Sequence, residues 1–255
     1  MRVISFCADG IKQAAKNGFY DWATNQDADI ICVQDLAAQE YDLQDNLYHP
    51  DGYYGYFLDS PEPNTNGVAI YVREMPKAIM TGLGLGEADM EARYIQADFE
   101  RISICCLFAP KATADDADSI AHRRHFFDAY QNHLNKIRNK RRDYIICGSL
   151  FTAHREIDLQ NPEAAAKQPG FTEDDNLWMD TLYRDLGYVD AFRQVRDDSD
   201  EFTWWPDGDR SQNGWRSDIQ VVSEGLRNQV EYGTIYKNQV FSSHAPLVMD
   251  YDIEI

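Results

Sequence analysis

Residues 144–151 read YIICGSLF, an apolar run that ends at Gly148. Four apolar residues in a row are too few for a helix, and a run that is apolar on both faces predicts a strand buried between two layers. Residues 121–138 precede it and carry apolar side chains at three- and four-residue spacing, which predicts an amphipathic helix. A second helical pattern follows from about residue 175 to 186 and stops at Gly187. This stretch therefore predicts a buried strand between two helices.

The same alternation extends outward to both ends of the chain. Residues 10–26 also show helical periodicity. Short apolar runs that predict further strands lie at residues 3–6, 30–33, 68–72, 102–107 and 246–249. Strands that alternate with helices indicate an α/β protein. Because no linker rich in Pro, Gly or Ser divides the chain, we predict a single domain over residues 1–255.

The composition limits the classes of partner. The 255 residues include 24 basic and 43 acidic side chains, a formal net charge of −19, which opposes non-specific binding to DNA, RNA or an anionic membrane. The densest basic cluster comprises Lys136, Arg138, Lys140, Arg141 and Arg142; it either complements a helix dipole or contacts a phosphate or an acidic protein. No leader or apolar run of membrane-spanning length is present, so we expect a cytoplasmic protein without a membrane partner. The five cysteines lie in or beside apolar runs, and we expect buried free thiols.

Several segments together resemble the exonuclease III family, within the endonuclease/exonuclease/phosphatase superfamily. They are MRVISF (1–6), DGI (9–11), ADIICVQ (28–34), NGVAIY (66–71), AHREIDLQN (153–161), TWW (203–205), NGWR (213–216) and HAPLV (244–248). Each is weakly specific alone, but in this order they extend nearly end to end. The resemblance implies a four-layered α/β sandwich of two central mixed β-sheets flanked by helices. It also implies phosphodiester hydrolysis with Mg²⁺ held by carboxylate and amide oxygens.

The positions that carry this chemistry in the family are largely substituted. The family's metal-site Asn corresponds to Cys7, and its metal-binding Glu corresponds to the shorter Asp35. Its catalytic Tyr corresponds to Phe108. Its Gly-Asp-x-Asn motif reads Gly148-Ser149-Leu150-Phe151, which lacks both the water-orienting carboxylate and the amide.

The end of the chain shows the same pattern. The family's Ser-Asp-His motif reads Ser242-Ser243-His244, so the imidazole remains without the neighbouring carboxylate, whereas Asp218 is retained. Loss of one general base or acid typically lowers a rate by about 10²–10⁴, and loss of one charge-stabilising donor by about 10²–10³. We therefore expect no efficient nuclease, no catalytic residue and no bound cofactor.

The pattern of substitution is itself similar to one branch of the family, the catabolite repression control proteins. This resemblance rests on three motifs: Gly148-Ser149-Leu150-Phe151, Gln34-Asp35 and Gly82-Leu83-Gly84. Cys7 departs from it. It implies a translational repressor that assembles with the RNA chaperone Hfq on A-rich mRNA and binds nucleic acid weakly or not at all alone. Candidate RNA or partner contacts are Arg138, Lys140, Arg141, Arg142, Arg93, Arg155, Arg193 and Arg216.

Other interpretations remain open at this stage. For Arg93 and Arg216 the alternative is an ion pair that braces the rim of the former active site. Trp204, Trp205 and Trp215 either stack on bases or belong to the core. The competing function is a weak exonuclease III-like or abasic-site endonuclease with Mg²⁺ near Asp35, Asp218 and His244; these residues with Cys7 would alternatively suit Zn²⁺. A scaffold that contacts only proteins is a third possibility.

Overall fold

A computed structural model describes residues 1–84 and 86–255. In this part of the chain two six-stranded sheets form the centre. The first sheet has the order β11 (Val230–Ile235), β12 (Leu247–Tyr251), β1 (Arg2–Cys7), β2 (Ile30–Gln34), β4 (Val68–Val72), β3 (Tyr54–Leu58). The second has the order β5 (Ala78–Thr81), β6 (Tyr94–Asp98), β7 (Ile102–Phe108), β8 (Asp143–Ser149), β10 (Asp218–Val222), β9 (Val189–Asp190). Both are mixed, since β1–β2 and β7–β8 are parallel pairs among antiparallel neighbours.

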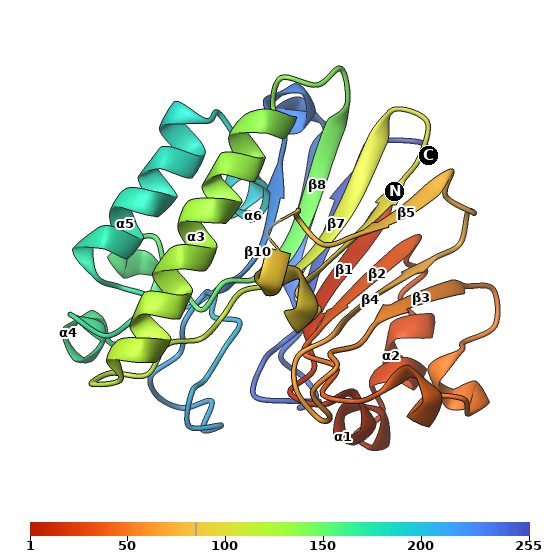
Figure 1. Ribbon diagram of the computed structural model, residues 1–255, viewed down its shortest axis with the longest axis horizontal. Coiled ribbons are helices and arrows are strands. Elements are labelled where there is room, and N and C mark those ends of the chain that lie inside the picture. Colours follow the sequence, from red (N-terminus) through yellow and green to blue (C-terminus); the bar gives the residue numbers. More distant parts are fainter. Residues whose placement is uncertain (85) are drawn as a thin grey trace.

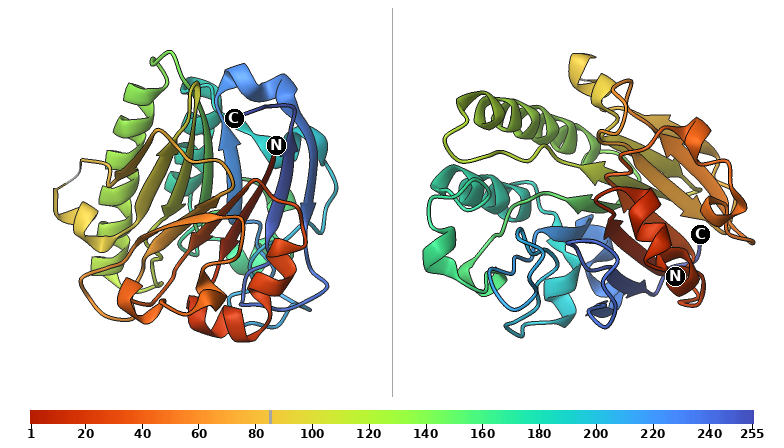
Figure 2. Two further views of the ribbon diagram at one scale, coloured as in Figure 1. Left: turned by 90° about the vertical axis from the view of Figure 1, so that its right-hand side faces the viewer. Right: turned by 90° about the horizontal axis from the view of Figure 1, so that it is seen from below.

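Helices cover the two outer faces of this pair of sheets (Figures 1 and 2). Helices α1 (Ile11–Lys16) and α2 (Phe19–Thr24) lie on the first sheet, and α3 (Ala117–Ile137) and α5 (Glu173–Asp180) lie on the second. The short helices α4 (Pro162–Ala165) and α6 (Ala191–Val195) stand in connections. The four-layered α/β sandwich is therefore confirmed.

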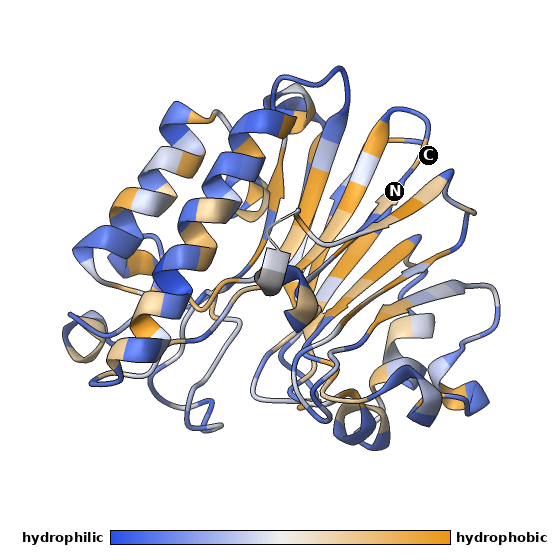
Figure 3. Ribbon diagram, in the orientation of Figure 1, coloured by the Kyte–Doolittle hydropathy of each residue, from blue (hydrophilic) through white to orange (hydrophobic). Residues whose placement is uncertain are grey.

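Apolar residues form three clusters, one in each space between these four layers. The central strands are mostly coloured as hydrophobic in Figure 3. The largest cluster lies between the sheets and includes Val3, Ile30 and Ile145. The second joins the first sheet to α1 and α2, and the third joins the second sheet to α3 and α5. Because strands that face two layers bury both of their faces, β2, β4 and β7 are buried along their whole length, as their mainly apolar sequences predict.

The predicted elements differ from the observed ones in three respects. The helix predicted over residues 10–26 is two short helices, because Gly18 adopts φ +88° and turns the chain. The helix near 175–186 begins at Glu173 and ends in a π turn over Thr181–Asp185. Strands β3, β5, β6, β9, β10 and β11 are not among the predicted runs, since polar side chains or a glycine interrupt them or they are very short.

The structure bears on the cysteines and on membrane-spanning helices. Cys7, Cys32, Cys105, Cys106 and Cys147 are all free and buried, which confirms the expected thiols. Among the described residues, no helix combines the length and apolar character that crossing a membrane requires.

Candidate functional site

One edge of the sandwich collects the ends of strands from both sheets. Cys7 ends β1, Asp35 directly follows β2, and Ser149 ends β8. Asp218 begins β10, where the antiparallel register places it opposite Ser149. The fold thus brings together side chains that lie far apart in the sequence, because parallel strands end at the same edge of a sheet and antiparallel strands begin there.

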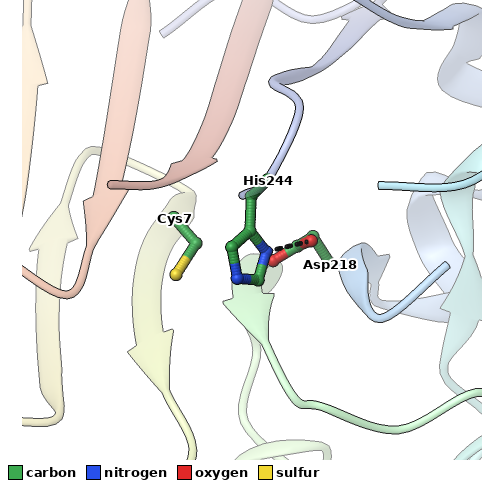
Figure 4. Close-up of side chains that lie close together, drawn as sticks. All are labelled: Cys7, Asp218 and His244. Carbon is green, nitrogen blue, oxygen red and sulfur yellow. Dashed lines mark hydrogen bonds and ion pairs between the residues drawn. The ribbon is translucent and has the colours of Figure 1, made fainter. Parts of the chain in front are cut away.

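His244 and Asp218 form a buried pair at this edge (Figure 4). The Nδ1 atom of His244 lies 2.8 Å from Oδ2 of Asp218, and the two side chains are 0% and 1% exposed. Burial alone would lower the pKa of His244, but Asp218, with Asp9 and Asp35 further off, raises it above its ordinary value. The pairing fixes the ring so that its second nitrogen, Nε2, lies on the side that faces Cys7.

Two carboxylates and the Cys7 thiol form a second group beside this pair. Ligand atoms of Cys7, Asp9 and Asp35 lie within 4.8 Å of one another, and so do those of Cys7, Asp218 and His244. Burial, followed by the charge of Asp9, raises the pKa of Asp35 to about 6. Burial, reinforced by these carboxylates, also raises the pKa of the Cys7 thiol well above its usual range. Negative charge is therefore concentrated where a cation would relieve it.

Asp9 is a site residue that the sequence-based assignment missed. Its Oδ2 accepts hydrogen bonds from the backbone N–H of Ser243, at 3.0 Å, and from the Ser243 hydroxyl. Its Oδ1 lies 3.7 Å from Nε2 of His244. The sequence signal for Asp9 was its position directly before Gly10 and just after a predicted strand. The chain turns there with φ +47°, a left-handed conformation that Asp tolerates.

Aromatic rings enclose the imidazole. The Phe151 ring packs edge-on against Trp204 and His244 at centroid distances of 5.1 and 5.8 Å, and Phe108 packs against Phe151 at 5.8 Å. Phe151 has φ +50°, a conformation that suits Asn and is strained for Phe. The resemblance implies an Asn at position 151. The backbone there keeps a conformation favourable to Asn, although the side chain is the apolar ring of Phe151.

Lys111 supplies a cation at the mouth of this aromatic group, and it too was missed. Its Nζ atom lies 4.8 Å from the ring centre of Trp204 and 5.8 Å from that of Phe151, while the residue is exposed. An exposed ammonium over aromatic faces remains available to a phosphate. The lysine follows the Phe-Ala-Pro motif directly, but a single lysine gives no sequence signal.

The donor set does not fit the all-oxygen magnesium site that the resemblance implies. Asp9 and Asp35 are hard oxygen donors of the kind Mg²⁺ accepts, but the third group within reach is the thiol of Cys7. Soft sulfur and imidazole donors instead suit transition metals and Zn²⁺. Magnesium chemistry is accordingly not assigned to these residues.

Four of the predicted RNA contacts, Arg93, Arg142, Arg193 and Arg216, are engaged in ion pairs. Arg216 is 2% exposed and pairs with Asp158 at 2.7 Å and Asp190 at 2.6 Å. Arg193 pairs with the same Asp158 at 2.6 Å. Despite the burial of Asp158, these two guanidinium groups lower its pKa to about 2. Arg216 therefore lies inside the protein and cannot reach a nucleic acid.

Arg93 also lies in an ion pair, at the rim of the site. Its Nε donates to Glu91 at 2.5 Å, and its guanidinium carbon lies 5.4 Å from the ring centre of Phe108. The side chain is only 10% exposed. Its position matches the bracing role left open above.

The other predicted contacts lie elsewhere. Arg138, Lys140 and Arg141 are exposed in the turn between α3 and β8, whereas Arg142 donates to the backbone oxygens of Phe99 and Ile102. The site lies at the opposite end of β8, about 20 Å away at about 3.3 Å per residue. Arg155 is exposed and precedes a 3₁₀ turn over Glu156–Asp158. The basic turn is thus a surface separate from the site.

The three tryptophans are interior residues. Trp204, Trp205 and Trp215 are 6%, 3% and 7% exposed and belong to the core between the sheets. Their faces are therefore covered by protein and do not form a surface on which bases stack.

Sequence comparison identifies related proteins over almost the whole chain. Residues 10–239 match the Endonuclease/Exonuclease/phosphatase family. The chain is 31% identical to an exodeoxyribonuclease of Bacillus subtilis over 99% of its own length and 100% of that protein. It is 28% identical to a DNA-(apurinic or apyrimidinic site) endonuclease of Dictyostelium discoideum, over 99% of its own length and 71% of that protein.

Solved structures show the same architecture. An AP endonuclease from Archaeoglobus fulgidus superposes with a TM-score of 0.86 at 23% identity, covering 99% of this chain and 100% of that one. The 3′ phosphatase NExo from Neisseria, bound to a product DNA hairpin, gives a TM-score of 0.88 at 20% identity with the same coverage. At these identities the likeness establishes the fold alone.

Proposed function

Because this chain belongs to the endonuclease/exonuclease/phosphatase family, we propose that it acts on nucleic acid at the edge where its two sheets meet. The proposal draws on an exposed cation, Lys111, over Trp204, which stacks on the buried His244, and on the carboxylates grouped with Cys7. Lys111 is suited to contact a phosphate, and Asp9 and Asp35 suit a cation that bridges to the nucleic acid. The fold and the names of the relatives support nucleic acid as the class of ligand.

The aromatic enclosure of His244 indicates that this action is binding rather than efficient hydrolysis. His244 is 0% exposed behind Phe151 and Trp204. A general base must come within hydrogen-bond reach of the water it activates, and this ring has no exposed face. The side chain opposite Asp218 is the hydroxyl of Ser149, which cannot orient water as a carboxylate does. This single arrangement carries the proposal of a low hydrolytic rate.

The finer proposal is a translational repressor that holds A-rich mRNA together with Hfq. A net charge of −19 disfavours RNA binding by the chain alone, whereas a partner that holds the RNA requires only local contacts from this protein. The exposed residues Arg138, Lys140 and Arg141 offer such contacts to RNA or to an acidic protein surface. This proposal rests on the sequence resemblance and on charge.

A weak divalent-metal-dependent nuclease is the second candidate, and the names of the relatives favour it directly. Both sequence relatives described above are named as DNA nucleases. The retained groups Asp9, Asp35, Asp218 and His244 are the observation in its favour, because they keep negative charge and an imidazole at one point. The activity would be cleavage of 3′ ends or of abasic DNA.

One experiment separates the candidates. Labelled A-rich RNA and a duplex with an abasic site are each incubated in Mg²⁺ buffer with the protein, with Hfq and with both. Native gels measure assembly, and denaturing gels measure cleavage. We expect intact nucleic acid and a slower RNA band that requires both proteins.

The Asp218→Ala variant is the control for cleavage. Cleavage by the purified protein that this variant abolishes would establish the nuclease and overturn the binding proposal. Cleavage unchanged in the variant would identify a contaminating nuclease, because Asp218 is the partner of the only imidazole at the site in the described chain. Intact nucleic acid without a slower band would overturn the repressor and leave a protein scaffold.

A further inference from the structure

We propose that Cys7, His244, Asp9 and Asp35 form a zinc-binding site in which Asp218 orients His244. The inference is independent of the proposed function, since a zinc site would serve a binding protein and an enzyme equally. It starts from the substitution at Cys7, which places sulfur among groups that otherwise suit a different metal.

The ligand atoms form two groups that share Cys7, one with Asp218 and His244 and one with Asp9 and Asp35. Cys7 belongs to both groups of close ligand atoms, so its sulfur lies within 4.8 Å of His244 nitrogen and of carboxylate oxygen from Asp9 and Asp35. Oδ1 of Asp9 lies 3.7 Å from Nε2 of His244. Bonds of about 2.0–2.3 Å to zinc give tetrahedral edges of about 3.3–3.8 Å, so this pair already has the required spacing. Asp9 is 36% exposed on its side chain, and its Oδ2 accepts from Ser243 while Oδ1 faces the imidazole.

The buried imidazole is incompletely satisfied without a cation. Nε2 of His244 has no hydrogen-bond partner among the described residues, although the side chain is fully buried. Such atoms in a native interior normally have a partner. The free Nε2 lies on the side of the ring nearest Cys7, where a metal ion would bind it (Figure 4).

Asp218 then acts as a positioning residue. Metal-binding histidines usually donate their other ring N–H to a carboxylate, which fixes the tautomer and the ring orientation. Nδ1 of His244 and Oδ2 of Asp218 lie 2.8 Å apart, as this arrangement requires. The ring also stacks on Trp204 with its plane within 17° of the indole, which restricts rotation.

The donor chemistry selects zinc over magnesium. One thiolate, one imidazole and two carboxylates match the mixed sulfur, nitrogen and oxygen ligands of protein zinc sites. Magnesium requires near-octahedral oxygen ligands and does not favour thiolate. On binding, the thiol proton of Cys7 leaves to solvent and the metal–sulfur bond forms. Asp9 is the exposed member of this group of residues.

The test uses the full-length protein after a chelator has removed any bound metal and the chelator itself has been removed. Equilibrium dialysis with elemental analysis measures zinc stoichiometry, and thermal denaturation compares Zn²⁺ with Mg²⁺. Cobalt(II) serves as a spectroscopic probe, because coordination by Cys7 produces a sulfur-to-cobalt absorption band. We expect one zinc per chain, a melting temperature raised by several degrees with Zn²⁺ but not Mg²⁺, and that cobalt band.

Variants assign the ligands. Cys7→Ser should abolish the cobalt–sulfur band and weaken zinc binding by about 100-fold, whereas Asp218→Asn should weaken it by about 10–100-fold and keep the band. Cys32→Ser is the matched control, since Cys32 is an equally buried thiol on the neighbouring strand, and it should leave both readouts unchanged. Absence of the cobalt band in wild-type protein, equal stabilisation by Mg²⁺, or equal loss in Cys32→Ser would each overturn the proposal. The wild-type spectrum decides the matter even if Cys7→Ser does not fold.

Discussion

Asp35 shows how one side chain at the site opposes folding. The carboxylate is largely removed from water and lies near Asp9, so the pKa of Asp35 rises to about 6 from its ordinary value near 3.8. The folded protein therefore retains a proton that the unfolded chain has lost between about pH 4 and 6. Because the folded state binds more protons in that range, its stability falls as the pH rises through it.

Replacement of this carboxylate by an amide should relieve the cost. We expect Asp35→Asn to leave stability nearly unchanged near pH 3, where the Asp35 carboxyl group is largely protonated in both the folded and the unfolded state, and to raise it by about 1–3 kcal/mol near pH 8. Urea denaturation at the two pH values in chelator-containing buffer measures the difference. A variant that is equally stabilised at both pH values would show that packing, not charge, is responsible.

The connections between elements are held by a buried ionic network. The guanidinium group of Arg216, which precedes β10, donates to two carboxylates. One is Asp158 in the 3₁₀ turn before α4, and the other is Asp190 at the end of β9. Arg193 on α6 adds a second cation to Asp158. Because these segments contribute few strand pairings, the network fixes the position of the loop that leads into Asp218. Removal of one member leaves a charge buried without its partner.

Asp158→Asn tests that dependence. We expect a loss of about 3–5 kcal/mol in the free energy of unfolding, since Arg216 keeps only Asp190 as a partner. The contribution of Asp158 should be present near neutral pH and disappear as the pH falls through the ordinary carboxyl range toward its lowered pKa of about 2. Glu224→Gln, which breaks the exposed pair with Arg227, is the control; its cost should stay below about 0.5 kcal/mol. Similar losses in both variants would show that burial does not matter here.

The turn between α3 and β8 is the element with exposed basic residues. We expect Lys140→Glu combined with Arg141→Glu to weaken assembly with Hfq and A-rich RNA by at least about tenfold, because repulsion replaces attraction. Arg142 is left intact, since it holds the backbone oxygens of Phe99 and Ile102. Titrated gel shifts measure the change, with Lys12→Glu and Lys16→Glu on α1 as a matched charge reversal. Unchanged assembly in the first variant would locate the interface elsewhere.

The charge of the whole molecule governs its encounter with RNA. A net charge of −19 repels a polyanion at long range, and salt screens that repulsion. We expect the protein alone to show no tight binding to A-rich RNA in filter-binding assays at physiological salt, and no increase in affinity as salt is lowered. A basic RNA-binding protein would gain affinity steeply on dilution of salt. Such a gain would contradict the charge argument and indicate a concentrated basic groove.

Local sequence determined the main elements and the fold class. Runs such as 30–33 and 102–107 are apolar on both faces, so they predict buried strands without any knowledge of the rest of the chain. Strands such as β10 could not be found this way, because Asp218 and Gln220 make it polar although it is buried. Their burial depends on partners elsewhere, since Gln220 donates to backbone oxygens of Val3 and Leu247.

The identities of all eight substituted or retained family positions were readable from motifs, but their meaning depended on the tertiary structure. Sequence could state that Cys7, Ser149 and Phe151 differ from the family pattern. Only the folded chain shows that Phe151 encloses His244, that Arg216 is buried, and that Asp9 joins Cys7 and Asp35. The physical reason is that composition and periodicity report local burial, whereas charge pairing and metal geometry arise between strand ends that are distant in the chain.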